Sequence, residues 1–259
     1  MEKQKLNFKN LIKENLMYII IFILDLILIC VNRAINGFEN ILWISDLSSF
    51  FGILNVIFTA KHTIFGLIFN LISTIFISVT SIYQKLWLNA VCCIFISAPS
   101  LLIGIIKWHK NEKSGNGQNL NTLSKKSRIF VFISFIIISI ISLLILKYFN
   151  GNLYYLDAFY SISCVYGILL CSFAFIDQFK YFITSNVIGI VMYTILTIQN
   201  INNLPFLFTT IIYLIVNIMG CINWIKIKKN IENNTTESKE LKNELSTTQN
   251  ENQVSLKNI

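Results

Sequence analysis

Long apolar runs with very few ionisable side chains are the feature that most constrains how this chain can fold. Four of them cover residues 17–31, 64–82, 129–146 and 206–221. Each is near the ~20 residues with which an α-helix crosses the hydrocarbon core of a bilayer. Hydrophobic residues make up 54% of the 259-residue chain and charged residues only 13%, about half the share expected in a soluble domain. The runs therefore predict an integral membrane protein.

Breaks between the apolar runs divide the chain into eight helices, so the expected fold class is an all-α polytopic membrane protein. The alternation of apolar and polar residues that is typical of membrane barrels is missing. The first run contains Asp25, and no small-residue cleavage site follows it, so we expect a retained helix rather than a signal peptide. The predicted helices are approximately 16–32, 42–60, 63–82, 86–107, 128–148, 154–175, 179–198 and 205–225.

The basic residues lie almost entirely at one set of helix ends. The opposite ends carry only Arg33, Lys85 and Lys147. Because cytoplasmic loops are enriched in Lys and Arg, we expect both termini in the cytoplasm and a multi-pass protein of the plasma membrane. The net charge of +8 is then attributed to orientation and to contact with the lipid bilayer. Since the basic residues are scattered over separate loops, the sequence argues against a nucleic-acid partner.

Polar segments set the predicted domain boundaries. The loop between the two halves is rich in Asn, Ser and Lys, and the segment after Lys229 is polar with no aromatic residue, which is typical of loosely structured chain. The predicted parts are a basic cytoplasmic N-terminus (1–15), a first transmembrane repeat (16–108), a cytoplasmic loop (109–127), a second transmembrane repeat (128–226) and a polar cytoplasmic tail (227–259).

The two halves show an internal repeat. The residues FGIL at 51–54 match YGIL at 166–169 with an offset of 115, and one residue inserted in a later turn reconciles this offset with that of the other pairs. Since each half contains four predicted spans, the two copies have the same orientation, and transporters place their substrate sites at such repeat interfaces. The pairs with an offset of 116 are Gly104 and Gly220, Trp108 and Trp224, and Asn70 and Asn186.

Neutral amides within the apolar helices are the main candidates for a binding site. Phe179, Phe182 and Asn186 fall at i, i+3 and i+7, which places two rings and one amide on a single helical face. Rings beside amides suit a flat heterocycle that stacks and accepts hydrogen bonds. The simpler alternatives are packing by the rings and interhelical hydrogen bonds of about 1 kcal/mol by the amides. The predicted substrate-binding residues are Phe179, Phe182, Asn186, Asn70, Tyr193, Asn89 and Asn217.

Two carboxylates lie inside predicted helices. Asp25 is central in the first helix, where the sequence leaves open a substrate contact, a proton-linked group and a packing role. Asp157 lies near the start of the sixth helix, where a negative charge favours the helix terminus.

Motifs of enzymes and of metal sites are missing from the sequence. There is no P-loop, no HExxH, no GxSxG and no carboxylate cluster. The six cysteines all lie in apolar runs, and neither His62 nor His109 has a partner at metal-ligand spacing. We therefore expect a protein that is not an enzyme, with no metal and no cofactor.

Several short motifs, taken in order, make the chain resemble the PnuC-type vitamin transporters, the nicotinamide riboside transporter family. The resemblance runs from about residue 46 to residue 226. Its motifs are FGLIFN at 65–70, YQKLWLN at 83–89, Pro99 followed by Gly104 and Trp108, Asp157, and NIMGCINWIK at 217–226.

The resemblance implies a SWEET-like fold of two three-helix bundles joined by a linker helix, with an extra N-terminal helix. It also implies facilitated diffusion of nicotinamide riboside, thiamine or riboflavin, which a cytosolic kinase then traps. In the riboside type a WxxWxxxN motif lines the site. Phe179, Phe182 and Asn186 occupy these positions here, so the amide is kept and both tryptophans are replaced. Gln84 and Lys85 also stand where the family has Gly and an acidic residue.

The sequence thus predicts a membrane transporter for a vitamin or vitamin precursor, with uptake of nicotinamide riboside by facilitated diffusion as the leading function. The alternatives are a thiamine or riboflavin transporter of the same family, and a vitamin-binding membrane subunit that needs an ATPase partner. A membrane scaffold without a small ligand is the third. The expected partner is a small-molecule vitamin, and the sequence leaves the oligomeric state open, a homo-oligomer included.

Overall fold

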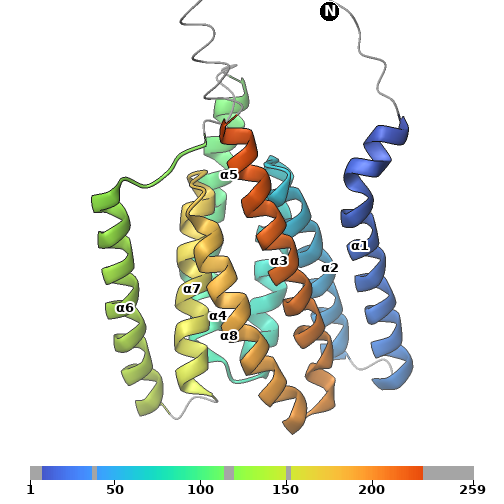
Figure 1. Ribbon diagram of the computed structural model, residues 1–259. Coiled ribbons are helices and arrows are strands. Elements are labelled where there is room, and N and C mark those ends of the chain that lie inside the picture. Colours follow the sequence, from blue (N-terminus) through green and yellow to red (C-terminus); the bar gives the residue numbers. More distant parts are fainter. Residues whose placement is uncertain (1–7, 37–39, 114–119, 150–152, 230–259) are drawn as a thin grey trace, which may run out of the picture.

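The computed structural model of the chain describes residues 8–36, 40–113, 120–149 and 153–229, and nearly all of them are helical. In Figure 1 the helices lie side by side in one bundle. They are α1 (Phe8–Asn36), α2 (Asn40–Ala60), α3 (Ile64–Tyr83), α4 (Trp87–Cys92), the π-helix η1 (Cys93–Ser97), α5 (Ala98–Lys113), α6 (Lys125–Tyr148), α7 (Tyr154–Ser172), α8 (Gln178–Gln199), the 3₁₀ turn η2 (Ile201–Asn203) and a last helix (Leu204–Lys229).

All eight predicted helices are present, which confirms the predicted all-α membrane fold. Seven of them are long and apolar enough to cross a bilayer, and α1 contributes a shorter apolar stretch, Asn15–Val31. The predicted helix 86–107 consists of α4, η1 and α5 placed end to end, which together form the span Trp87–Lys110. The grouping into two three-helix bundles with a linker helix stays a prediction.

The later predicted domain boundaries fall close to helix ends, whereas the first does not, because α1 begins at Phe8, inside the predicted N-terminus (1–15). The predicted loop 109–127 is shorter than expected, because α5 continues to Lys113 and α6 already begins at Lys125. The last helix runs to Lys229, and the rest of the predicted tail, 230–259, lies outside the described residues, as do residues 1–7 of the predicted N-terminus.

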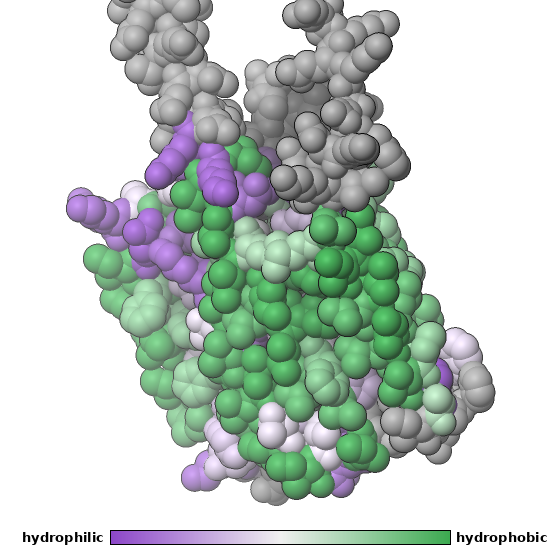
Figure 2. Space-filling view, turned by 45° about the vertical axis from the view of Figure 1, so that its right-hand side comes forward, coloured by the Kyte–Doolittle hydropathy of each residue, from purple (hydrophilic) through white to green (hydrophobic). Residues whose placement is uncertain are grey.

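The outside of the bundle is apolar. Figure 2 shows hydrophobic residues covering the middle of one face, with hydrophilic residues gathered toward one end. On α6, Phe130 is 73% exposed and Leu144 is 60% exposed. In water such a surface would be unfavourable, whereas lipid tails solvate it. The chain is therefore a multi-pass membrane protein.

The two halves pack against each other in equivalent ways. Gly104 of α5 lies against Ser172 at the end of α7, where an added Cβ would come within 2.9 Å of the Ser172 Cβ. Its counterpart Gly220, on the last helix, lies against Ala60 at the end of α2, where the corresponding distance is 3.1 Å. In both halves a glycine thus lets the fourth helix of one half approach the second helix of the other half closely.

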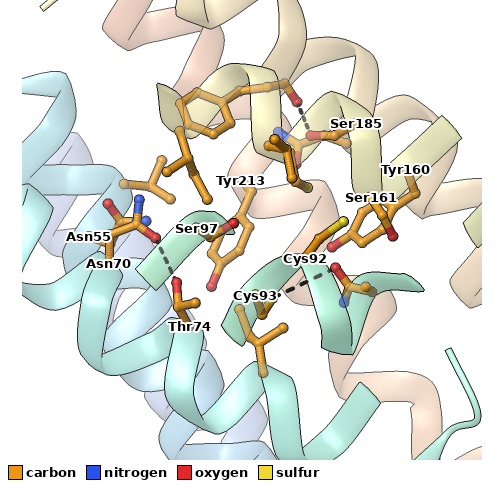
Figure 3. Close-up of a pocket in the computed structure, with 18 of the residues that line it drawn as sticks. Asn55, Asn70, Thr74, Cys92, Cys93, Ser97, Tyr160, Ser161, Ser185 and Tyr213 are labelled. Carbon is orange, nitrogen blue, oxygen red and sulfur yellow. Dashed lines mark hydrogen bonds between the residues drawn. The ribbon is translucent and has the colours of Figure 1, made fainter. Parts of the chain in front are cut away.

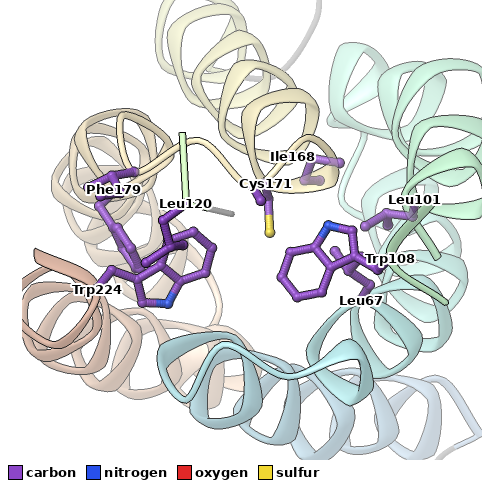
Figure 4. Close-up of a cluster of buried hydrophobic side chains, with 10 residues drawn as sticks. Leu67, Leu101, Trp108, Leu120, Ile168, Cys171, Phe179 and Trp224 are labelled. Carbon is purple, nitrogen blue, oxygen red and sulfur yellow. The ribbon is translucent and has the colours of Figure 1, made fainter. Parts of the chain in front are cut away.

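Two tryptophans at equivalent repeat positions meet near one end of the bundle. Trp108 and Trp224 are almost completely buried, and their ring centroids lie 6.4 Å apart. The ring of His62, in the turn after α2, contacts both, at 5.2 Å and 4.6 Å between centroids. Figure 4 shows the two indoles facing each other between the halves, with Leu120 and Cys171 beside them. We call Trp108, Trp224, His62 and the residues packed around them the tryptophan cluster.

The two indoles differ in hydrogen bonding, which allows a matched prediction. Trp224 Nε1 donates to the Thr59 carbonyl at 2.8 Å, whereas Trp108 Nε1 is buried without a partner among the described residues. Trp224→Phe and Trp108→Phe remove similar volumes, but only Trp224→Phe also removes a made hydrogen bond. We expect Trp224→Phe to lower the free energy of unfolding by about 1 kcal/mol more than Trp108→Phe does. Unfolding of both variants in detergent measures this, and equal losses would contradict it.

The segment that precedes α6 is bound to the turn between α7 and α8. The backbone N–H of Asn121 donates to the Ala174 carbonyl, and that of Ile176 donates to the Asn121 carbonyl, both at 3.0 Å. The Leu123 N–H donates to Asp177 Oδ2 at 2.9 Å. Burial opposes ionisation of Asp177, but this bond and the charges of Lys180 and Arg128 outweigh it and hold the pKa of the carboxyl below its ordinary value. The contacts fix the start of α8.

His62 makes the tryptophan cluster sensitive to acid. Burial between the two indoles lowers the pKa of the imidazole to about 4. The folded protein therefore binds fewer protons at this residue than the unfolded chain between an ordinary histidine pKa of about 6.5 and about 4. Stability contributed by neutral His62 is present above about pH 6.5 and is lost as the pH falls toward about 4.

We expect His62→Asn to remove part of this acid sensitivity. Asn tolerates the left-handed backbone of residue 62, whose φ is 57°. The melting temperature in detergent, measured at neutral and at acidic pH, provides the test. His109→Asn is the control, since His109 is exposed on α5 and the variant should retain the acid sensitivity of the wild type. A wild-type decrease that is unchanged in His62→Asn would contradict the prediction.

Candidate functional site

A cavity of about 90 Å³ lies between the two halves, inside the membrane-spanning region. Its lining comes from α2, α3, α4 and η1 of the first half, and from α7, α8 and the last helix of the second half (Figure 3). Neither α1 nor α6 lines it. Transporters place their substrate sites at such a repeat interface, so we take this cavity as the candidate site.

Both ends of the cavity are closed by buried apolar side chains. The tryptophan cluster lies beyond one end, near the C-terminal end of α5. A second cluster, which includes Leu86 before α4, Met192 and Leu196 of α8, lies beyond the other end. The structure therefore shows a closed conformation, and the cavity is smaller than the ~300–1,000 Å³ of typical ligand pockets.

Three helices of the first half present the same polar unit to the cavity. In each, an asparagine oxygen accepts a hydrogen bond from the residue one turn later. The Asn side chains are held in this way by their own helices, which fixes the amide orientation and leaves Nδ2 as the donor group. The bonds are Thr59 Oγ1 to Asn55 Oδ1 at 3.0 Å, Thr74 Oγ1 to Asn70 Oδ1 at 3.4 Å, and Cys93 Sγ to Asn89 Oδ1 at 3.9 Å. In Asn89 this Nδ2 already donates to Ser81 Oγ at 2.7 Å.

The second half contributes an amide donor without a partner. Asn186 of α8 lines the cavity and is only 6% exposed. Its Nδ2 is buried and has no hydrogen-bond partner among the described residues. An unpaired buried donor costs about 1–3 kcal/mol. A ligand that brings an acceptor oxygen into the cavity would remove this cost.

Two aromatic rings that line the cavity are seated on glycines of the repeated FGIL and YGIL motifs. Gly167 of α7 accommodates the ring of Phe182, and a Cβ there would come within 2.6 Å of it. Gly52 of α2 accommodates Tyr213 of the last helix, and a Cβ there would come within 1.6 Å of the hydroxyl oxygen. The second helix of each half thus provides the space for one ring of the cavity wall.

The structure brings together five of the seven predicted site residues and places two elsewhere. Phe182, Asn186, Asn70, Asn89 and Asn217 all line the cavity. Phe179 instead belongs to the tryptophan cluster, where its ring lies edge-on to Trp224 at 5.3 Å. Tyr193 lies in the apolar cluster at the other end and reaches the cavity only through Tyr160, whose ring centroid is 6.1 Å away.

Sequence reasoning missed most of the hydroxyl and thiol groups of the lining. Spacing could have indicated some of them, because residues i and i+4 share a helix face. The signal is a small polar residue four positions after an amide, or an aromatic residue four positions before one. This spacing holds for Asn55 and Thr59 and for Tyr213 and Asn217. The missed lining residues include Asn55, Thr59, Thr74, Cys93, Ser97, Tyr160, Ser161, Cys164, Ser185 and Tyr213.

Asp157, next to the cavity, is a satisfied carboxylate. Its Oδ1 accepts from Ser161 at 2.8 Å, and its Oδ2 accepts from the Leu88 N–H at 3.2 Å. It therefore joins α7 to the start of α4, where the unpaired N–H groups of a helix favour a negative charge. The π-helix η1 that follows α4 directs Cys93 and Ser97 into the cavity, and such segments occur frequently at functional sites.

The lining combines amide donors, hydroxyl groups and aromatic faces with no Lys, Arg, Asp or Glu among the described residues. It suits an organic molecule with a flat ring and several oxygen acceptors. It is not suited to a free phosphate group, because burying such an anion without a cation is costly.

Comparisons with known proteins agree with this description. Residues 42–226 match the family model described as nicotinamide mononucleotide transporter. A relative from Neisseria mucosa, named nicotinamide riboside transporter PnuC, is 22% identical over 193 residues, which cover 72% of this chain and 73% of the relative. A solved structure described as the vitamin B3 transporter PnuC has a TM-score of 0.66 at 20% identity, over 82% of this chain and 92% of that chain.

Proposed function

The chain belongs to the nicotinamide mononucleotide transporter family, and on this basis we propose that it carries nicotinamide riboside across the membrane through the cavity between its halves. The relative named nicotinamide riboside transporter supports the substrate class. The cavity supports it independently, because the amides of Asn70 and Asn186 suit the ribose and carboxamide oxygens. The rings of Phe182 and Tyr213 suit the pyridinium, a cation that aromatic faces attract.

The uncharged lining favours the riboside over the mononucleotide in the family's name. The mononucleotide carries a phosphate, whose burial needs Arg, Lys or a helix N-terminus aimed at it. The described lining contains no basic residue. The riboside has hydroxyl groups in place of the phosphate and needs only hydrogen bonds.

The unpaired amide of Asn186 is the observation that carries this proposal. A buried donor in a membrane protein is normally satisfied, and this one lies at a cavity wall shared by both halves. Binding of an acceptor there would be favourable in the closed conformation, in which both ends of the cavity are covered. Exchange between conformations open at either end would then carry the substrate in both directions.

We further propose that transport is facilitated diffusion at the plasma membrane, with both termini in the cytoplasm. The sequence contains no nucleotide-binding P-loop. The start of α1 and the end of the last helix lie at the same end of the bundle (Figure 1), which is also the lysine-rich end. The positive-inside rule supports a cytoplasmic position for that end.

Thiamine and riboflavin are the second set of candidates, and the residue at position 182 favours considering them. Phe182 is the one ring of the α8 motif that lines the cavity, and the riboside type has a tryptophan there. A smaller ring changes the stacking area offered to the substrate.

Melting temperatures of the purified protein with each ligand test the substrate assignment. We expect nicotinamide riboside to raise the melting temperature and nicotinamide mononucleotide to leave it unchanged, since ligands that bind only the folded state stabilise it. If thiamine or riboflavin raises the melting temperature and nicotinamide riboside does not, that vitamin replaces nicotinamide riboside as the proposed substrate. Equal stabilisation by the mononucleotide would contradict the argument from the uncharged lining.

A further inference from the structure

Asp25, near the middle of α1, is a completely buried carboxylate that the proposed substrate site does not use. Its side chain has no exposed surface. Its Oδ1 accepts a hydrogen bond of 2.9 Å from Ser49 Oγ on α2, and its Oδ2 has no partner among the described residues. Asp157 provides the contrast, because both of its oxygens accept hydrogen bonds.

A chain of hydroxyl groups leads from the last helix to Asp25. Ser49 Oγ and Thr209 Oγ1 lie 2.8 Å apart. Because the single hydroxyl hydrogen of Ser49 is used in the bond to Asp25, Thr209 is the donor in this pair. The donors therefore run from Thr209 through Ser49 to the carboxyl. This chain crosses between the halves, since Ser49 belongs to the first and Thr209 to the second.

The charged groups around Asp25 do not neutralise it. Arg33, two turns further along α1, forms its ion pair with Asp46 of α2. Asp46 and Tyr213 are near enough to interact electrostatically with Asp25, and neither brings a positive charge. No ion pair to Asp25 occurs among the described residues. An ionised carboxylate at this depth would be an uncompensated charge in a medium that disfavours charge strongly.

We propose that Asp25 is a proton-binding site, with the proton on Oδ2 in this closed conformation and released when the last helix moves away from α2. A metal ion fits less well, because the site offers one carboxyl and two hydroxyl groups in a line. Hard cations gather about six oxygens around one point. A proton needs a single free oxygen, and Oδ2 is one.

The position of the hydroxyl chain links this proton to the movement of the halves. Separation of α2 from the last helix breaks the bond between Ser49 and Thr209 and opens the surroundings of Asp25 to water. A group that binds a proton more tightly in one conformation favours that conformation at low pH. Acid therefore favours the closed conformation, and the rate of facilitated diffusion depends on pH without a proton having to cross with the substrate. This consequence rests on the proposed function, whereas the proton site itself does not.

Infrared difference spectra test the site without any transport. The spectrum of the wild type minus that of Asp25→Asn, recorded in lipid at neutral pH, should contain the carbonyl band of a neutral carboxylic acid. The amide of Asn has the shape of the protonated acid, so the variant should fold. A carboxylate band in place of the carbonyl band overturns the proposal.

Uptake of nicotinamide riboside into proteoliposomes tests the link to movement. Between about pH 6 and about pH 8 the wild-type rate should change severalfold, up to about tenfold per pH unit, the limit for one linked proton. Asp25→Asn should have a rate independent of pH, and Asp25→Glu should restore the dependence. Ser49→Ala should shift the profile toward higher pH, because it removes a donor that favours the ionised form. A pH profile unchanged in Asp25→Asn, or a rate that follows sodium concentration instead of pH, overturns the proposal. If no uptake occurs at all, the proposed function has failed, and the infrared result still decides the proton site.

Discussion

Asn186→Ala should weaken the binding of nicotinamide riboside by about ten- to a hundredfold, equivalent to about 1.4–2.8 kcal/mol. The variant removes an amide donor that is buried and unpaired in the closed conformation. The acceptor oxygen of the ligand would then be buried without a hydrogen bond, and it is this unpaired oxygen that costs affinity. Titration calorimetry with the purified protein measures the change directly.

Asn223→Ala is the matched control for Asn186→Ala. Asn223 Nδ2 donates to the Ala60 carbonyl at 2.8 Å, outside the cavity lining. Its loss should lower the stability of the contact between α2 and the last helix and leave the affinity unchanged. Equal losses of affinity in both variants would show that Asn186 affects binding only by stabilising the fold. An unchanged affinity in Asn186→Ala would show that Asn186 does not bind the substrate.

Gly52→Ala should abolish most of the transport activity. The added methyl group would lie 1.6 Å from the hydroxyl oxygen of Tyr213 and 3.2 Å from Ser73 Oγ, so the tyrosine ring has to move into the cavity. Because Ala is a better helix former than Gly by about 1 kcal/mol, a loss of activity would not come from a weaker helix. Uptake into proteoliposomes, normalised to the amount of folded protein, measures the effect.

A second substitution separates this packing effect from a general defect. Tyr213→Phe removes the atom that collides first, and the next contact, with the ring carbon Cζ, is 2.8 Å away. We expect the double variant Gly52→Ala/Tyr213→Phe to recover part of the activity that Gly52→Ala loses. A double variant as inactive as Gly52→Ala, with Tyr213→Phe alone active, would show that Tyr213 is not the residue displaced.

Helix positions could be predicted because the bilayer imposes them. Apolar runs near ~20 residues leave few alternatives to a spanning helix, and most predicted boundaries differ from the observed ones by a few residues. The first helix is the exception, because α1 begins at Phe8 and the predicted helix begins at residue 16. The predicted helix 154–175 ends earlier, at Ser172, because the chain turns at Ala174, whose φ is 57°. The apolar residues around Ala174 include no glycine or proline, so the sequence gives no signal for a turn at this point.

The face of a helix could be predicted for the candidate site, but the depth along the helix could not. Phe179, Phe182 and Asn186 do share a face of α8. Phe182 and Asn186 lie at the level of the cavity, whereas Phe179, one turn earlier, is part of the tryptophan cluster and Tyr193 lies about two turns beyond Asn186. Depth depends on where neighbouring helices place their small and bulky residues, and spacing within one helix does not contain this information.

Uptake of labelled nicotinamide riboside into liposomes that contain this protein alone tests the proposed transport most directly. We expect the substrate to equilibrate across the membrane without ATP, the mononucleotide to stay outside, and Asn186→Ala to slow uptake at low substrate concentration. Uptake that requires an added ATPase would identify a binding subunit instead. The absence of nicotinamide riboside uptake by folded protein would contradict the central claim.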